Sequence, residues 1–402
     1  MKPAEHTSRH CPICGSDQKK VLFQQHFSTV LLVQGYDVVV CENCGFGFAD
    51  QIPEQKALDA YYRDLSKFEF EHRDGKESES DEKRLLDVAR LLGELIPDPQ
   101  ARILDLGCST GRLLAALKDS GFPNVWGLDP SPGCAEAARK LYDVPVFIDT
   151  FSGFGELDQK FDFVIMIGVL EHIRELESLL SVLKKIIRPN GRAYIDVPDA
   201  TQFADWPDAP FQEFSTEHIN FFSGRSLMNL MQMHGFNCRL SQKAQRSYTE
   251  TTVMPSVEAL FENDGVKRAA WVRDDESECR LQEYIRQSLQ VDASIRGVLE
   301  KTANSKQPII VWGIGTHTQR LLAAGALERL NICLFVDSNP KYHGEKLRGI
   351  PVVSPNELKA RIEPILICSR VFQLEIERQA REELKLNNQL LLLYDLRDSQ
   401  TA

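Results

Sequence analysis

The clearest pattern in the chain is an alternation of short apolar runs and longer amphipathic runs between about residues 85 and 245. Short apolar runs predict buried strands, and apolar residues that recur every three or four positions predict helices. The run Ile103–Leu106 is followed by Gly107 and Gly111 and then by an amphipathic segment to about Asp119. A strand, a glycine-rich turn and a helix in this order favour a site where a ligand approaches the backbone.

The alternation continues beyond this turn. We expect further strands at 125–129, 144–148, 161–168 and 192–197, and helices at 85–95, 135–141, 176–187 and from a Ser223 cap to His234. Strands that alternate with helices predict right-handed crossovers and a parallel sheet. Ligands of such sheets bind at the carboxyl ends of the strands.

Two further segments show helical or α/β patterns. Leucines and isoleucines recur at helical spacing between residues 281 and 299, which predicts an amphipathic connector without catalytic features. The last hundred residues contain the apolar run 309–312 with a Gly-x-Gly turn and the run 333–336 ending at Asp337. They predict a second, smaller α/β unit.

Two CxxC pairs stand near the N-terminus. Cys11 and Cys14 form the first pair, and Cys41 and Cys44 form the second. Four thiolates at this spacing can complete the tetrahedron that structural zinc prefers. The β-branched and aromatic residues between the pairs predict short strands, so the segment is expected to form a zinc ribbon. Disulfides or a redox CxxC are the alternatives.

Composition and charge narrow the class of protein. The 402 residues carry a net charge of −11, which argues against broad nucleic-acid binding because that requires a basic surface. No apolar run approaches the ~18 residues of a membrane span, and the first residues show no signal core. We therefore expect a cytoplasmic protein that binds neither nucleic acid nor membrane, with reduced cysteines.

Acidic residues follow three of the expected strands. Asp105 precedes the glycine turn, Asp129 lies about 20 residues beyond it, and Asp149 follows the third strand. An acid after the second strand can bind the two hydroxyls of a ribose. NAD and S-adenosylmethionine (SAM) are both compatible with this arrangement.

Two motifs favour SAM. The segment Asp105–Gly111, DLGCSTG, resembles the first motif of class I SAM-dependent methyltransferases, and it lacks the third glycine of the dinucleotide fingerprint. The segment Phe161–Ile173, FDFVIMIGVLEHI, resembles the fourth-strand motif of the same superfamily. The resemblance covers about residues 85 to 245.

The resemblance implies a set of cofactor-binding residues. Gly107, Cys108 and the turn are expected to hold the methionine end of SAM, Asp129 the ribose, and Asp149 or Thr150 the adenine edge. The complete expected set is Asp105, Gly107, Cys108, Gly111, Asp129, Pro130, Asp149, Thr150 and Gly168.

The segment Asp337–Val352 resembles the small Rossmann-like domains of sugar-modifying enzymes. Whether its glycines serve a ligand or only backbone geometry stays open. The order of the parts resembles the three-domain nucleotide-sugar C-methyltransferases. The expected parts are a zinc ribbon and linker (1–75), a Rossmann-like methyltransferase core (76–245), a helical connector (246–304) and a smaller Rossmann-like α/β domain (305–402).

In that family a Tyr-x-Glu-His segment after the fifth strand supplies the catalytic base. Glu217 and His218 match the segment, and Ser215 stands in place of the tyrosine. We expect His218 to remove the acceptor proton and Glu217 to orient the imidazole. His172 either faces the acceptor or packs. Tyr61 and Tyr62 are expected to pack, with a pocket-lining role as the alternative.

The predicted function is SAM-dependent methylation of a nucleotide-linked sugar, at the carbon of a keto-deoxysugar through an enolate. O-methylation of a sugar hydroxyl is the first alternative. A zinc-bearing RNA or protein methyltransferase and a non-catalytic carbohydrate-biosynthesis module are the others.

Overall fold

The computed structural model describes residues 6–28, 32–65, 77, 79–154, 159–206, 209–247, 252–268 and 270–394. The chain divides into two compact units. The first unit comprises Met1–Phe23, Asp37–Trp206 and Glu217–Leu281, and the second comprises Gln24–Tyr36, Pro207–Thr216 and Gln282–Ala402. No helix among the described residues is long and apolar enough to cross a membrane.

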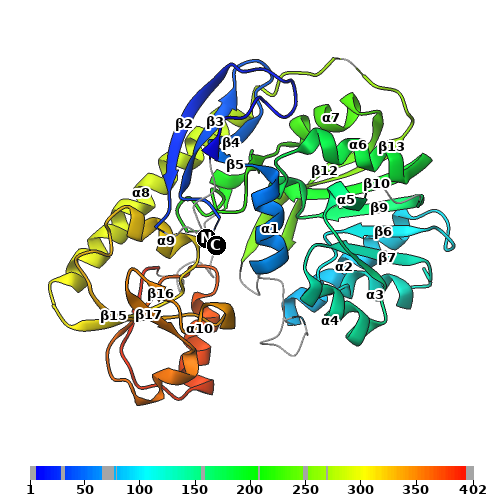
Figure 1. Cartoon of the computed structure of the whole chain (residues 1–402). Coiled ribbons are helices and arrows are strands. Elements are labelled where there is room, and N and C mark those ends of the chain that lie inside the picture. The colour runs from blue at the N-terminus through cyan, green and yellow to red at the C-terminus, as the bar shows by residue number, and fades with distance from the viewer. Residues whose placement is uncertain are drawn as a thin grey trace. The chain divides into compact units, whose positions relative to one another are not determined.

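A seven-stranded sheet forms the centre of the first unit (Figure 1). Its strand order is β12-β13-β10-β9-β6-β7-β8, and the five strands from β10 to β8 run parallel. The strands are β6 (Ile103–Leu106), β7 (Val125–Asp129), β8 (Val146–Ile148), β9 (Phe161–Ile167), β10 (Ile187–Pro198), β12 (Phe236–Ser247) and β13 (Val253–Asn263). Chain order reverses between β6 and β9, and this reversal places a ligand crevice at their carboxyl ends.

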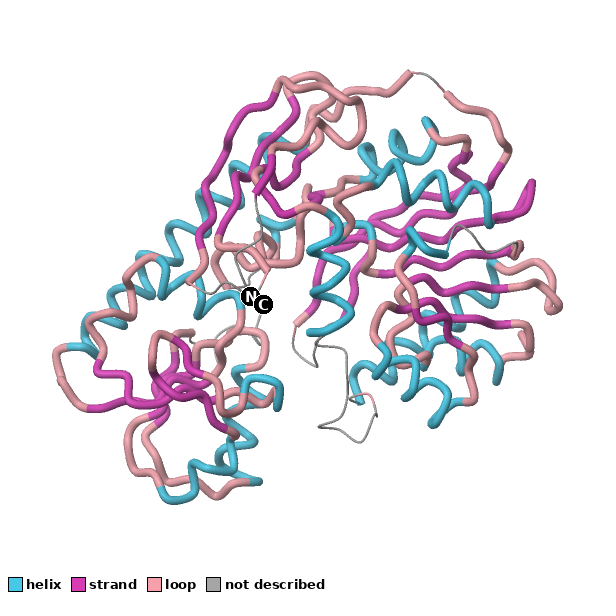
Figure 2. The backbone as a smooth tube through the Cα atoms, viewed as in Figure 1, coloured by secondary structure: helices cyan, strands magenta, loops and turns pink. Residues whose placement is uncertain are grey.

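Helices cover both faces of this sheet, as the tube view also shows (Figure 2). Apolar side chains of α5, α6 and α7 pack on one face, and those of α2, α3 and α4 pack on the other. The strands between them are buried on both sides, which explains their nearly continuous apolar runs. The helices are α2 (Glu79–Leu95), α3 (Arg112–Asp119), α4 (Pro132–Tyr142), α5 (Phe151–Phe154), α6 (Leu176–Ile186) and α7 (Gly224–Met233). Ser223 caps α7, as the sequence predicts.

Residues 246–304 were expected to form a helical connector, but a strand of the central sheet precedes the helix. Residues 253–263 form β13, which pairs antiparallel with both β10 and β12 and completes the sheet. The connector helix α8 (Ser277–Ala303) begins only at Ser277. Charged residues inside β13 hide its strand pattern, because Glu258 and Glu262 interrupt an otherwise apolar run.

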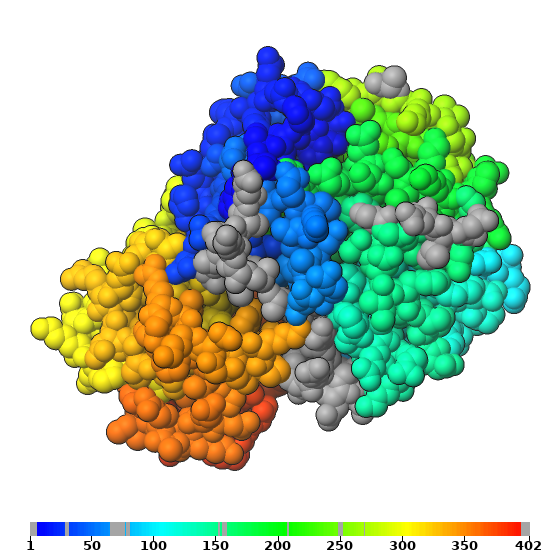
Figure 3. All heavy atoms as spheres, in the orientation of Figure 1, coloured from blue at the N-terminus to red at the C-terminus, as the bar shows by residue number. Residues whose placement is uncertain are grey.

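The ribbon is a second sheet with strand order β11-β4-β3-β2. Its strands are β2 (Lys19–His26), β3 (Gly35–Cys41), β4 (Gly47–Asp50) and β11 (Asn220–Phe221). The last of these comes from the segment between β10 and β12 of the seven-stranded sheet, and Asn220 pairs with Phe48 and Phe221 with Gly47. The short pair β1 (His6–Thr7) and β5 (Ile52–Pro53) precedes helix α1 (Gln55–Leu65). In the space-filling view, α1 in light blue lies directly against the green surface of the core (Figure 3).

The second unit has a six-stranded sheet of order β16-β17-β15-β14-β18-β19, in which only the β16–β17 pair is antiparallel. Its elements are β14 (Pro308–Trp312), α9 (Thr316–Ala323), β15 (Asn331–Val336), β16 (Lys346–Leu347), β17 (Ile350–Val353), β18 (Ile365–Ile367), α10 (Gln373–Arg378) and β19 (Leu390–Leu392). Residues 308–392 therefore have the α/β arrangement that the sequence predicts.

Candidate active site

The glycine turn after β6 packs tightly against the neighbouring strand β7. Gly107 and Gly111 have φ angles of 80° and 78°, which residues other than glycine rarely adopt because their Cβ atom clashes with the backbone. The Gly107 N–H donates to the Leu128 carbonyl over 2.8 Å. A Cβ atom on Gly127 of β7 would lie 2.3 Å from the Cys108 Sγ. The turn is thus fixed in a shape that leaves its backbone accessible to a ligand.

Two buried acids lie side by side beneath this turn. Asp129 accepts hydrogen bonds from the Ser109 and Ser131 N–H groups, each over 2.9 Å, and so ties the first turn to the second. Burial raises the pKa of the Asp105 carboxyl to about 7, and the charge of Asp129 contributes to the same shift. The pair therefore provides negative charge that a cationic ligand would compensate.

The other expected cofactor residues lie at the carboxyl ends of the adjacent strands. Pro130 follows β7, Asp149 and Thr150 follow β8, and Gly168 follows β9. Asp149 is exposed, and its Oδ1 accepts from the Thr150 N–H over 2.7 Å. Gly168 has a φ of 68°, and its N–H donates to the Asp196 carbonyl over 2.9 Å. The nine expected residues thus share one edge of the sheet.

The expected catalytic residues are brought together at the end of β9. His172 lies in the short 3-10 helix Leu170–His172, and its ring centroid is 5.1 Å from that of His218. The His172 Nδ1 is 3.0 Å from the Glu217 carbonyl oxygen. Since a carbonyl only accepts, Nδ1 carries the proton and Nε2 is left with a lone pair. Burial lowers the pKa of His172, which favours its neutral form.

The position of residues 217–220 follows from two anchoring side chains. The Asn220 Nδ2 donates to the Leu170 and Ile173 carbonyls over 2.8 and 2.7 Å. Buried Arg9 of the ribbon segment donates to the Ile219 carbonyl and to the Asn220 Oδ1, over 3.2 and 3.0 Å. Together with the β11–β4 pairing, these bonds hold Glu217 and His218 against His172.

Tyr61 of α1 was expected only to pack, but its hydroxyl also makes a polar contact. Its hydroxyl donates to the Glu217 Oε1 over 2.9 Å. The ring of Tyr62 meets that of His172 edge-on, with centroids 5.7 Å apart. Sequence reasoning also left out Glu171, although it stands beside His172 in the GVLEH segment and is only 2% exposed. The adjacency of an acid and a histidine was the signal that could have identified it.

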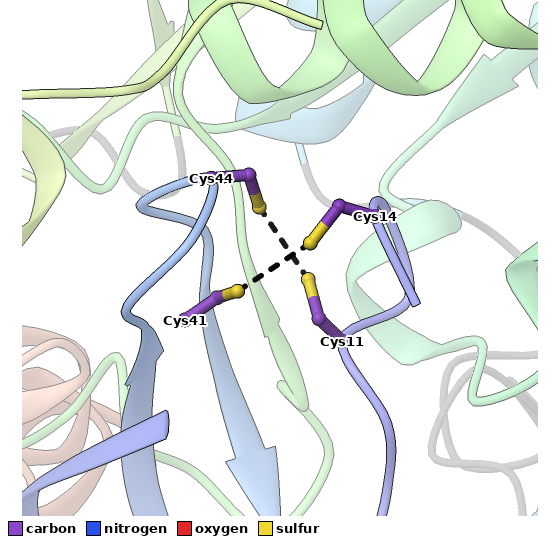
Figure 4. A group of neighbouring side chains, drawn as sticks. All are labelled: Cys11, Cys14, Cys41 and Cys44. Carbon is purple, nitrogen blue, oxygen red and sulfur yellow. Dashed lines mark hydrogen bonds between the residues drawn. The ribbon is translucent and has the colours of Figure 1, made fainter. Parts of the chain in front are cut away.

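The four cysteines of the ribbon converge as their spacing predicts (Figure 4). The Sγ atoms of Cys11 and Cys44 are 3.5 Å apart, as are those of Cys14 and Cys41. Thiolates around one zinc ion at ~2.3 Å lie somewhat less than 4 Å from one another. The donor set and its dimensions therefore fit a closed four-thiolate zinc site.

The fold and the turn geometry define the class of this domain. A seven-stranded sheet with this order, an antiparallel β13 and a glycine turn over an acid are features of a SAM-binding, Rossmann-like methyltransferase fold. Residues 79–241 match the family model described as "Methyltransferase domain". These residues form a class I SAM-dependent methyltransferase domain, and this prediction is confirmed. Residues 305–390 match the model "C2185-like, N-terminal".

Individual relatives are similar over part of the chain. The ubiquinone biosynthesis O-methyltransferase of Rhizobium rhizogenes is 32% identical over 123 residues, which are 29% of this chain and 48% of the relative. An O-methyltransferase of Pyrenophora dematioidea is 27% identical over 29% of this chain and 49% of its own length. The chain thus spans about half the length of these curated relatives.

Among solved structures, the chain resembles the 1,6-didemethyltoxoflavin-N1-methyltransferase of Burkholderia thailandensis, which was crystallised with S-adenosylhomocysteine. The match has 20% identity and a TM-score of 0.41, and it covers 55% of this chain and 96% of that one.

Proposed function

We propose that this protein transfers the methyl group of SAM to a nucleotide-linked sugar, at the carbon beside the carbonyl of a keto-deoxysugar. The observation that carries the proposal is the cluster of Glu217, His218 and His172 at the end of β9, where Gly168 belongs to the expected SAM site. In this proposal the cluster supplies a basic side chain on the acceptor side of the bound methyl donor. His218 acts as the base in this proposal.

The chemistry requires proton removal and alignment. The methyl group on a sulfonium is already activated, so the protein has to align the acceptor atom with it and accept a proton. His218 takes the proton from the carbon, the resulting enolate attacks the methyl group, and S-adenosylhomocysteine leaves. Tyr61 holds the Glu217 carboxylate, and the Glu217 backbone holds the His172 ring. A phenol therefore reaches Glu217 from α1, although Ser215 replaces the tyrosine expected beside it.

The second unit contains a turn of the same design as the glycine turn after β6. Asp337 of the second unit accepts from the Ile314 and Asn339 N–H groups over 3.0 and 2.9 Å, as Asp129 does from Ser109 and Ser131. The Gly313 N–H donates to the Val336 carbonyl over 2.8 Å, matching Gly107 and Leu128. We propose that this turn binds a nucleotide.

O-methylation is the second candidate function. Both curated relatives described above are named O-methyltransferases. The same base serves this reaction by removing a hydroxyl proton, so the geometry of the cluster is compatible with both. The product decides between them.

We also propose that the four cysteines bind a structural zinc ion. The strand β4 lies three residues after Cys44 and pairs with β11, which follows His218 by two residues. The ion would stabilise the ribbon, and the ribbon would in turn hold the segment that carries the proposed base.

The test is a product analysis with the purified chain, SAM and a panel of nucleotide-linked keto-sugars, sugars with free hydroxyls, phenols and RNA. We expect one mono-methylated nucleotide sugar, whose fragmentation places the methyl group on carbon. The variant His218→Ala should lower turnover about 100-fold or more while SAM binding is retained. His234→Ala, on the C-cap of α7, is the matched control and should keep normal turnover.

Other products would contradict parts of the proposal. A methyl group on oxygen would establish the second candidate, and methylated RNA would establish a different acceptor class. SAM binding without S-adenosylhomocysteine formation over the whole panel would indicate a non-catalytic module. Near-normal turnover of His218→Ala would exclude His218 as the base.

A further inference from the structure

Two buried polar atoms near the 3-10 helix Leu170–His172 lack a hydrogen-bond partner among the described residues. One is the Oε2 of Glu171, a residue that is only 2% exposed, and the other is the hydroxyl of Tyr62. A buried carboxylate oxygen without a partner carries a large desolvation cost. Two such atoms in one cluster with His172 indicate that the site is built for an additional ligand.

Arg246 is the cation that interacts with Glu171, and it already forms an ion pair with Asp196. The guanidinium of Arg246 on β12 contacts both carboxylate oxygens of Asp196, at 2.8 and 3.1 Å, and donates to the Asp196 carbonyl over 3.2 Å. Asp196 therefore takes the hydrogen bonds of Arg246, and Glu171 interacts with this cation only through its charge. The missing ligand is expected to be positively charged.

The donor atoms around Glu171 have the arrangement of a metal site. Glu171, His172 and His218 each offer one ligand atom, and these atoms all lie within 4.8 Å of one another. The Glu171 Oε1 is 4.0 Å from the His172 Nε2. The bond between the His172 Nδ1 and the Glu217 carbonyl leaves the Nε2 lone pair free for a metal, and metal-binding histidines are typically oriented by such a bond.

We propose that Glu171, His172 and His218 bind a divalent transition-metal ion, at a site separate from the four cysteines. Two imidazoles and one carboxylate suit Zn²⁺, Mn²⁺, Fe²⁺ or Co²⁺ better than Mg²⁺ or Ca²⁺, which prefer oxygen ligands. Ligand atoms that share an ion lie roughly 3 to 3.5 Å apart, so the three side chains close by about 1 Å on binding. Three protein ligands leave coordination positions for water or an acceptor oxygen, which the Tyr62 hydroxyl can hydrogen-bond.

The inference goes beyond the proposed methyl transfer and has a consequence for it. A metal ion uses the lone pair with which His218 would accept a proton, so the bound ion and the free base are alternative states of the same residue. Because binding is measured without any acceptor, the result does not depend on the proposed substrate.

The experiment titrates Co²⁺ into the full-length protein isolated with zinc in its four-cysteine site, followed by visible absorption. Cobalt bound to nitrogen and oxygen ligands gives d–d bands without the thiolate-to-cobalt charge-transfer band that the cysteine site would produce. We expect about one equivalent of such cobalt in the wild type. Glu171→Gln and His218→Gln should each weaken this binding 10-fold or more.

Glu175→Gln and His234→Gln are matched controls, because Glu175 is exposed in the same loop and His234 lies outside the cluster. Both should bind cobalt as the wild type does. Calorimetric SAM binding checks that each variant is folded, and His218→Gln decides the result if Glu171→Gln fails this check. The proposal is overturned if the wild type shows no thiolate-free band at millimolar cobalt, or if the folded cluster variants bind cobalt like the controls.

Discussion

Asp105 predicts that SAM binding is coupled to proton release. The pKa of its carboxyl is about 7 in the ligand-free protein because the group is buried beside Asp129. SAM carries a sulfonium and an ammonium group, and a positive charge within ~4–6 Å lowers a carboxyl pKa by about 1–3 units. A bound SAM at the glycine turn should therefore ionise Asp105.

The size of the effect follows from the titration curve. If binding lowers the pKa from about 7 to about 5, roughly 0.5 proton is released at pH 7, about 0.8 at pH 6 and almost none above pH 8.5. The same titration determines the direction in which SAM affinity changes with pH. The free site is protonated below pH 7 and has to lose that proton, so SAM binds more weakly as the pH falls, by about 25-fold from pH 7 to pH 5 and by up to about 100-fold over the whole titration.

Calorimetry in buffers with different ionisation enthalpies measures the number of protons released. Asp105→Asn should abolish the release and flatten the pH dependence of the dissociation constant. Asp119→Asn, at an exposed position at the end of α3, should leave both unchanged. A wild-type binding enthalpy that is independent of the buffer at pH 6–7, or equal proton release in Asp105→Asn, would refute the reasoning.

Three further predictions concern neighbouring features. Tyr61→Phe removes the hydrogen bond to the Glu217 carboxylate and should lower turnover about 10-fold with an unchanged SAM dissociation constant. An equal decrease in turnover and in SAM affinity would instead indicate a general disturbance of the site. Cys41→Ser should lose the zinc equivalent found by elemental analysis and melt at a lower temperature, and full zinc retention would contradict the four-thiolate site. Gly127→Ala should destabilise the protein by roughly 1–3 kcal/mol because its Cβ would lie 2.3 Å from the Cys108 Sγ. Gly297→Ala, which meets open space, is its control in thermal unfolding.

Local patterns were sufficient to predict much of the methyltransferase core. The strand from Ile103, its turn and the helix from Arg112 follow from contiguous residues, since each apolar run is short and each turn is marked by glycine. The cysteine cluster also follows from spacing alone. In contrast, two glutamates interrupt the apolar run of β13, and it becomes a strand because Val257, Ala259 and Phe261 are buried against the sheet.

The acceptor side could be predicted only in part. His172 and His218 were identified separately, but no local pattern shows that their rings meet 5.1 Å apart. The contact between Tyr61 and Glu217 joins residues 156 positions apart in the chain. Such a contact depends on where α1 packs, and tertiary packing is not encoded in the spacing of either segment.

The pairing of β11 with β4 has a consequence for how the chain is made. Phe48 leaves the ribosome long before its partner Asn220, with about 170 residues between them. Until the partner arrives, the ribbon presents an unpaired strand edge that is open to pairing with another chain. The sheet is completed only after Asn220 and Phe221 have been synthesised, so the segment bearing Glu217 and His218 cannot take up its position on the ribbon before that point.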